Sequence, residues 1–211
     1  MLADRINGWL RRLPVWMLYA LAPVPAIWLL WLGLTGGLGV EPIEALEHEL
    51  GELALQLLIA GLCITPLRRF AGVNLLRFRR AVGLIAFLYV VLHLLVWLVL
   101  DVQDLGRIWA DILKRPYITV GMGAFLLMLP LALTSNNRAV RALGRRWQRL
   151  HRLTYGVVLL AALHFVMARK GFQVEPLLYA GAILALLALR LVPRRRNAAR
   201  GGGPARATAR G

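Results

Sequence analysis

Three of the four histidines in the sequence, His93, His151 and His164, lie in or beside strongly apolar stretches. His151 stands where the basic segment GRRWQRLHR meets an apolar run, and His164 follows thirteen residues later, about 20 Å along a helix. Ligand-capable side chains inside membrane segments are costly, so each is a functional hypothesis. Neutral imidazoles on facing helices are the usual protein ligands of a haem iron in a helical bundle. The histidines therefore predict a haem-binding site.

The composition is that of a membrane protein. Of 211 residues, 59% are hydrophobic, and the mean hydropathy is +0.64, which is too apolar for a soluble domain of this size. Six apolar stretches approach the length of a bilayer core: 15–34, 50–67, 81–100, 117–134, 150–168 and 177–192. We expect an all-α membrane protein with six transmembrane helices in a haem-binding bundle.

The charges alternate between the loops. The net charge is +16, and 21 of the 26 basic residues fall in the N-terminus, in 68–80, in 135–152 and in the tail from 190. Nine of the ten acidic residues fall on the opposite side. The positive-inside rule therefore places both termini in the cytoplasm. Because the arginines flank apolar segments, we expect them to contact membrane lipid and not nucleic acid.

Residues 1–192 are expected to form one transmembrane domain. Its first span contains Pro23 and Pro25 and follows Pro14, so that helix should be kinked or broken. Residues 193–211 are rich in Gly, Ala and Arg and lack apolar periodicity. They are predicted to be a basic, disordered cytoplasmic tail.

Two of the histidines should lie at similar depth. The third and fifth spans run in the same direction, with His93 thirteen residues after Arg80 and His164 fifteen residues after Arg149. We therefore expect these two imidazoles to face each other in the outer half of the membrane and to bind one haem iron. A hydrogen bond from the other ring nitrogen would satisfy each ring. A purely structural interhelical hydrogen bond is the alternative for His93.

His151 marks a second, inner level. The symmetrical partner, fourteen residues before His93, is Arg79, so this level has one clear candidate ligand and the haem count is one or two. Thirteen residues also turn an ideal helix about 220° beyond whole turns, so His151 and His164 share no face. Either the helix is bent or the two histidines serve differently. His48, in the acidic segment EPIEALEHELGEL, is expected to be solvated or to make a loop contact.

Several short motifs follow one another along most of the chain. They are GGLG at 36–39, ITPLRR at 64–69, RRAVGL at 79–84, HLLVW from His93, KRPYITVG at 114–121, LTSN at 133–136 and LGRRWQRLH at 143–151. Their order and spacing resemble the MsrQ family, formerly YedZ. These are haem-binding membrane subunits of bacterial periplasmic methionine sulfoxide reductase systems, within the ferric-reductase-like transmembrane group.

The resemblance implies a multi-pass protein of the bacterial inner membrane that holds b-type haem, with FMN also associated. It implies an electron-transfer subunit, and not the catalytic one, which takes electrons from the quinol pool or a cytosolic flavin reductase. The implied acceptor is a periplasmic molybdopterin-containing methionine sulfoxide reductase. His93, His151 and His164 coincide with the family's haem-associated histidines, and Arg79 stands where related NADPH oxidases carry a fourth histidine.

Electrons are expected to enter near Arg79, Arg145, Arg146 and His151, where arginines could hold a flavin phosphate. They would leave through the outer loops 40–49 and 101–115. A ferric or cupric reductase would have the same haem-binding spans, and a non-redox scaffold or transporter would make the histidines structural. A transporter should show acidic residues within its spans, and only Glu52, at a span edge, comes close to this pattern.

Overall fold

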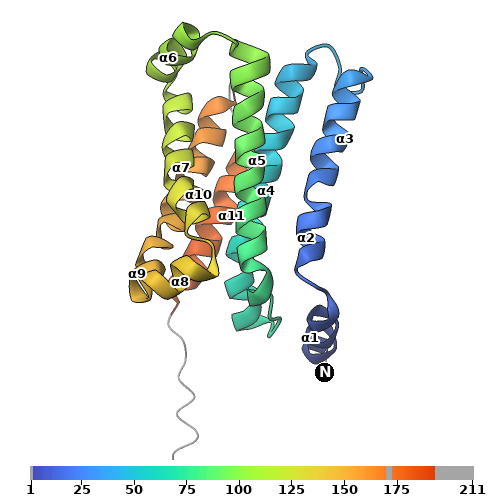
Figure 1. Cartoon of the computed structure of the whole chain (residues 1–211), viewed down its shortest axis with the longest axis vertical. Helices are drawn as coiled ribbons and strands as arrows, with labels where there is room; N and C mark the ends of the chain where they lie inside the picture. Colours follow the sequence, from blue (N-terminus) through green and yellow to red (C-terminus); the bar gives the residue numbers. More distant parts are fainter. Residues whose placement is uncertain (1, 170–172, 193–211) are drawn as a thin grey trace, which may run out of the picture.

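The computed structural model describes residues 2–169 and 173–192, and every regular element in them is helical. Six helical segments are long and apolar enough to cross a membrane, as expected, and they form an upright bundle (Figure 1). The predicted tail, 193–211, lies outside the described residues. The spans are α2 (Trp16–Leu21) with α3 (Pro23–Leu34), α4 (Pro42–Phe70), α5 (Arg79–Leu95) with the π-helical η2 (Val96–Val102), α7 (Pro116–Leu133), α9 (Arg145–Leu150) with α10 (Leu153–Ala168), and α11 (Val174–Leu191).

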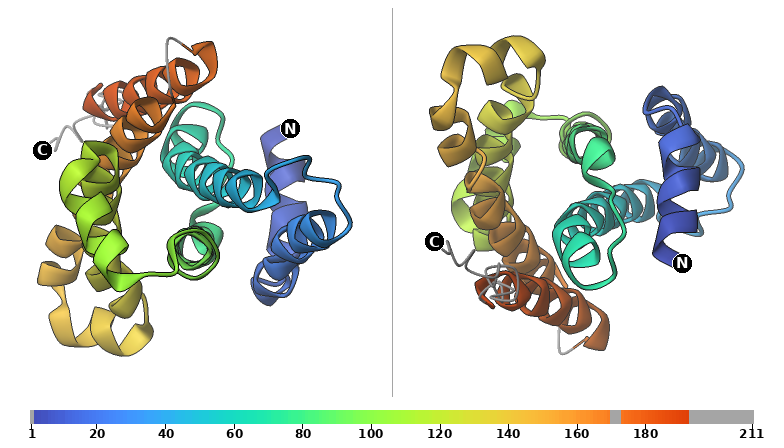
Figure 2. Two further views of the ribbon diagram at one scale, coloured as in Figure 1. Left: turned by 90° about the horizontal axis from the view of Figure 1, so that it is seen from above. Right: turned by 90° about the horizontal axis from the view of Figure 1, so that it is seen from below.

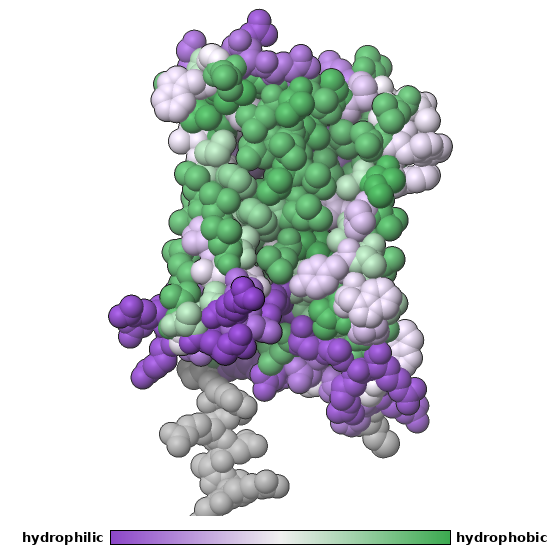
Figure 3. Space-filling model, viewed as in Figure 1, coloured by the Kyte–Doolittle hydropathy of each residue, from purple (hydrophilic) through white to green (hydrophobic). Residues whose placement is uncertain are grey.

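Short helices cover the two ends of the bundle. At one end lie α1 (Leu2–Arg12), η1 (Leu76–Phe78) and α8 (Asn137–Leu143), together with α9 and the end of α11. At the other end lies α6 (Leu105–Lys114). On the face shown in Figure 3, the surface between the ends is a broad apolar band, with hydrophilic residues above and below it. The predicted basic segments within the described residues therefore gather at one end.

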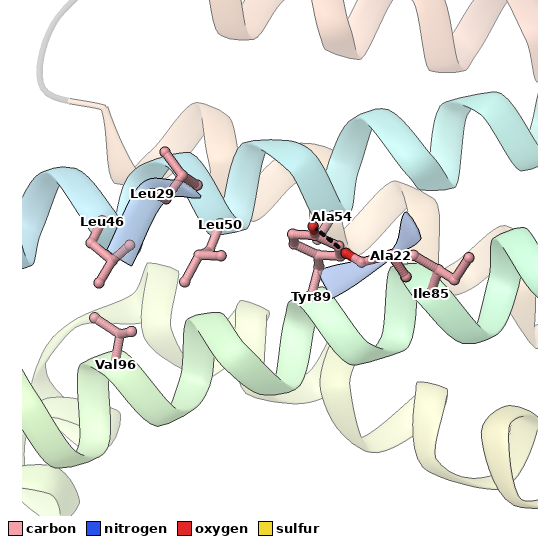
Figure 4. Close-up of a cluster of buried hydrophobic side chains, with 8 residues drawn as sticks. All are labelled: Ala22, Leu29, Leu46, Leu50, Ala54, Ile85, Tyr89 and Val96. Carbon is pink, nitrogen blue, oxygen red and sulfur yellow. Dashed lines mark hydrogen bonds between the residues drawn. The ribbon is translucent and has the colours of Figure 1, made fainter. Parts of the chain in front are cut away.

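The first span is broken, as its prolines predict. The break falls at Ala22, between α2 and α3. The Tyr89 hydroxyl of α5 donates a hydrogen bond of 2.7 Å to the Ala22 carbonyl. Around it, apolar side chains of α3, α4 and α5 form a buried cluster that includes Leu29, Leu50 and Ile85 (Figure 4). This bond and cluster dock the first span onto the rest of the bundle.

The remaining helices form two tight pairs. α4 packs mainly against α5, and α10 packs mainly against α7, while α11 contacts both α4 and α10. Seen along the bundle, α2 and α3 lie at one edge, and α7, α10 and α11 lie on the far side of α4 and α5 (Figure 2). A second buried cluster, with Leu62, Val158 and Ile183 at its centre, joins α4, α10 and α11.

The second span starts earlier than expected. The apolar run indicated a start at Leu50, whereas α4 begins at Pro42. Proline suits the first turn of a helix, and acidic residues there interact favourably with the helix dipole, so the acidic segment continues the helix outward. Most of the loop predicted at 40–49 is therefore helical. Glu44, Glu47 and Glu49 therefore lie on this outward extension of α4, and Glu52 lies further inside the helix.

Replacing Tyr89 by phenylalanine is expected to weaken the docking of the first span. The hydroxyl is buried, with Tyr89 only 2% exposed, and its loss leaves the Ala22 carbonyl without this donor. We expect a loss of about 1 kcal/mol of stability, seen as a lower Tm in detergent. Tyr19→Phe is the matched control, because Tyr19 lies on the first span and its side chain is 42% exposed. Equal Tm values for the two variants would contradict this role of the hydrogen bond.

Candidate functional site

His93 of α5 and His164 of α10 meet inside the bundle. Their ring centroids lie 6.2 Å apart, with an angle of 76° between the ring planes. The two residues belong to different helix pairs, α4 with α5 and α7 with α10. The third and fifth spans were predicted to bring the two histidines together at similar depth, and the two rings do lie next to each other.

Each of the two rings is held by a backbone carbonyl. Nδ1 of His93 lies 2.9 Å from the Glu47 carbonyl oxygen on α4, and Nδ1 of His164 lies 2.7 Å from the Tyr117 carbonyl oxygen on α7. Because a carbonyl only accepts, Nδ1 must carry the proton and donate in both rings. A neutral imidazole with Nδ1–H keeps its lone pair on Nε2, the form in which histidine binds a metal.

A glycine lies beside each of these hydrogen bonds. Gly51 comes four residues after Glu47, and Gly121 comes four residues after Tyr117. A Cβ atom at Gly51 would lie 3.1 Å from Nδ1 of His93, and one at Gly121 would lie 2.7 Å from Nδ1 of His164. The glycines thus let the imidazole edge rest directly on the neighbouring helix. The same arrangement is built twice, once in each helix pair.

The spacing of the two rings fits a metal ion between them. Two Nε2 atoms, each about 2 Å from one ion, would put the ring centroids about 6 Å apart, and the observed separation is 6.2 Å. Within residues 2–169 and 173–192, no group of three or more His, Cys, Asp or Glu side chains could hold a metal by itself. A group that brings further donors of its own would suit such a pair. His93 and His164 would fit a haem, whose iron is commonly held by histidine.

His151 is held differently. The Thr134 hydroxyl donates to the Pro130 carbonyl at 2.6 Å, so it accepts from Nε2 of His151 at 3.1 Å. Trp147 stacks on the imidazole with the ring centroids 3.9 Å apart, and its Nε1 donates to the Thr134 carbonyl at 2.9 Å. In this tautomer Nδ1 of His151 keeps the lone pair, whereas His93 and His164 keep it on Nε2.

His151 lies in the turn that separates α9 from α10. His151 therefore lies just before α10, which begins at Leu153 and contains His164. The histidine sits at the basic end, away from the facing pair, and close enough to Arg79 and Arg80 for electrostatic interaction. The structure does not test whether His151 or Arg79 contacts a cofactor, so that assignment stays a prediction.

The other residues singled out from the sequence do not belong to the pair of His93 and His164. Arg79 lines a cavity with Arg69 and Arg190, whereas Arg145 and Arg146 are not among the residues that line it. His48 is half-buried on α4, next to Glu47, and does not lie in a loop as expected. Of the arginines predicted at the inner entry, only Arg79 lines this cavity.

The supporting residues were missed at the level of sequence. Tyr117 and Gly121 fall inside the KRPYITVG motif, but nothing in the motif alone shows that a carbonyl and a missing Cβ serve a histidine on another helix. Trp147 falls inside the LGRRWQRLH motif, but the motif alone does not show that its side chain contacts His151 and Thr134. A glycine within an apolar helix is the one signal that could have drawn attention to Gly51 and Gly121.

The outer end of α7 is fixed by Arg115. Its Nη1 donates to the Tyr117 hydroxyl at 3.3 Å, and its Nε lies 3.2 Å from Asp111 Oδ1. The hydrogen bond to Tyr117, together with the nearby acidic groups, raises the pKa of the Arg115 guanidinium above its ordinary value. Arg115 therefore stays charged beside the residue whose carbonyl holds His164.

The bundle with its facing histidines defines a ferric-reductase-like transmembrane protein, and residues 50–162 match the family described as ferric reductase like transmembrane component. Two relatives carry the name protein-methionine-sulfoxide reductase haem-binding subunit MsrQ. The Brucella anthropi protein is 48% identical over 185 residues, covering 87% of this chain and 84% of the relative. The Agrobacterium fabrum protein is 50% identical over 179 residues, covering 84% and 83%. The chain belongs to the MsrQ family. No solved structure matches it.

Gly121→Ala is expected to disturb the site without removing a ligand. The added Cβ would lie 2.7 Å from Nδ1 of His164, too close for the ring to keep its hydrogen bond to Tyr117. Losing such a supporting bond typically costs 10- to 100-fold in affinity, so haem affinity should fall at least about tenfold. The haem content of the purified protein, with its reduced absorption spectrum, measures this.

Gly83→Ala is the matched control, because a Cβ at Gly83 would meet no atom within 4 Å. It makes the same gain in helix propensity on a spanning helix. Gly51→Ala should lie between the two, since its Cβ would be 3.1 Å from Nδ1 of His93. Equal haem content in Gly121→Ala and Gly83→Ala would show that the close approach does not matter.

Proposed function

We propose that this chain is the haem b electron-transfer subunit of a methionine sulfoxide reductase system in the bacterial inner membrane. It would pass electrons from the quinol pool, or from a cytosolic flavin reductase, to a periplasmic molybdopterin-containing catalytic subunit that repairs oxidised proteins. Its own role is conduction, and the reduction of methionine sulfoxide belongs to the partner. The names of the relatives support the haem and the reductase system.

The observation that carries the proposal is the geometry of His93 and His164. Both rings donate Nδ1–H to a carbonyl and keep a lone pair on Nε2, at a ring separation of 6.2 Å. His93 and His164 would hold a haem there, and the haem would supply one-electron redox chemistry. The residues position both ligands before haem binds. Because both rings are already held by carbonyls, the protein would need to rearrange little when the haem gains or loses an electron.

The two ends of the bundle fit different tasks. The end with α1, α8 and α9 carries the basic segments, and by the positive-inside rule it faces the cytoplasm, with both termini. The other end carries the acidic start of α4 and α6, and would face the periplasm. A basic patch on the catalytic subunit would dock there, with coupling that weakens as salt rises. The arginines at the cytoplasmic end suit a donor or an FMN phosphate.

His93→Ala is expected to abolish the low-spin b-type spectrum. It removes one ligand and leaves His164 alone, so the haem should be lost or become high-spin. The measurement is the absorption spectrum of detergent-purified protein, oxidised and dithionite-reduced, with the haem-to-protein ratio. His48→Ala is the control, since this histidine lies on the neighbouring helix outside the pair. Full haem content and an unchanged spectrum in His93→Ala would refute the assignment.

His151→Ala is expected to leave the spectrum of the haem held by His93 and His164 in place. Nε2 of His151 is occupied by Thr134, and its ring stacks on Trp147, so the first effect should be a lower Tm. The measurement is the haem-to-protein ratio alongside thermal unfolding. A ratio that falls by half, with the remaining spectrum unchanged, would instead place a second haem at His151.

A further inference from the structure

A cavity of about 300 Å³ opens at the basic end of the bundle, away from the facing histidines. Four spanning helices contribute to it: the last turns of α4, the first residue of α5, the first turn of α10 and the last turn of α11. Three of the lining residues carry guanidinium groups, namely Arg69, Arg79 and Arg190. The others carry hydroxyls or are apolar, namely Thr65, Tyr155, Pro66 and Leu189.

The charge in this cavity is not balanced by the residues that line it. None of the lining residues that the structure describes is acidic. In the sequence, only Asp4 of the ten acidic residues belongs to the basic side. The Nε atom of Arg190 is buried and, in the described part of the chain, has no hydrogen-bond partner. A cluster of partly buried cations is costly unless an anion compensates it, so the site calls for an anionic ligand.

The arginine at the back of the cavity is fixed in place. Nη2 of Arg190 donates to the Leu62 carbonyl at 2.8 Å, and Nη1 donates to the Tyr155 hydroxyl at 3.0 Å. The guanidinium also lies over the Tyr155 ring, 5.4 Å from its centroid. Opposite it, Nη1 of Arg69 lies 3.5 Å from the Leu189 carbonyl oxygen. The groups are thus positioned before a ligand arrives, which lowers the entropic cost of binding.

The surroundings distinguish a lipid from a soluble anion. Exposed apolar side chains lie on the helix ends beside the cavity, namely Leu67 and Phe70 on α4 and Leu191 on α11. Guanidinium groups at the ends of spanning helices can bind the phosphate of a lipid headgroup, and the exposed apolar side chains beside them can contact its acyl chains.

We propose that this cavity binds the phosphate of an anionic phospholipid from the leaflet at the basic end. The lipid would cover the ends of α4 and α11 and hold them to α5 and α10 through its phosphate. This proposal does not depend on the function proposed above. A phosphate monoester in solution, such as FMN, shares the chemistry of the headgroup, and the experiment separates the two sources.

The experiment measures the Tm of the full-length protein in an uncharged detergent. Four additions are compared, namely phosphatidylglycerol, phosphatidylcholine, inorganic phosphate and FMN. The test variant is Arg69→Gln, and the matched control is Arg68→Gln, which removes the same charge one residue earlier without touching the cavity. Arg79→Gln is the second test variant, in case Arg69→Gln does not fold.

Phosphatidylglycerol should raise the Tm of the wild type and of Arg68→Gln, and phosphatidylcholine should raise it much less. In Arg69→Gln or Arg79→Gln, about tenfold more phosphatidylglycerol should be needed for the same shift, since one charge-assisted contact is lost. If only FMN or inorganic phosphate raised the Tm, and did so through Arg69, the cavity would be a site for a soluble phosphate, and the proposal of a bound lipid would be overturned. Equal responses in Arg68→Gln and Arg69→Gln, or no response to any addition, would overturn the site.

Discussion

The site depends on one interaction made twice, the hydrogen bond from Nδ1 of a histidine to a carbonyl of the adjacent helix. In a regular helix the carbonyls of Glu47 and Tyr117 already accept the amides of Gly51 and Gly121, four residues further on. The imidazole is a second donor to the same oxygen, and it approaches over the glycine that carries the first. A Cβ there would lie 2.7 Å from the ring at Gly121 and 3.1 Å from it at Gly51, so its absence favours this geometry. It therefore ties ring orientation, tautomer and helix spacing together.

The pairing of the helices follows from the same contacts. α4 and α5 form one pair and α7 and α10 the other, and each pair contributes one histidine and the carbonyl that holds it. The distance between the two rings is then set by how the pairs pack, through the buried cluster of α4, α10 and α11. A change far from the histidines that shifts one pair against the other would change the ligand distance. The packing of α11 against α4 and α10 therefore helps to set the distance between the two rings.

The sequence predicted six spans, the break in the first span and the common depth of His93 and His164, because these follow from hydropathy, proline and residue counts. It did not predict that α4 begins at Pro42, since an acidic amphipathic extension has no apolar signal. Nor did it predict the turn at His151, which a basic run of good helix formers conceals. The roles of Gly51 and Gly121 depend on which helices are neighbours, and spacing along one chain does not contain that information.

The charge distribution connects the orientation of the protein with its surfaces. Of the 26 basic residues, 21 fall in the N-terminus, in 68–80, in 135–152 and from 190 on, and nine of the ten acidic residues fall in the other segments. The basic segments therefore carry a large excess of positive charge, which anions outside the chain would compensate. At the cavity of Arg69, Arg79 and Arg190 this need is concentrated in one place, enclosed by four helices. The same asymmetry that would orient the chain in the membrane thus gathers the arginines of the proposed anion site at the basic end, where electrons would enter.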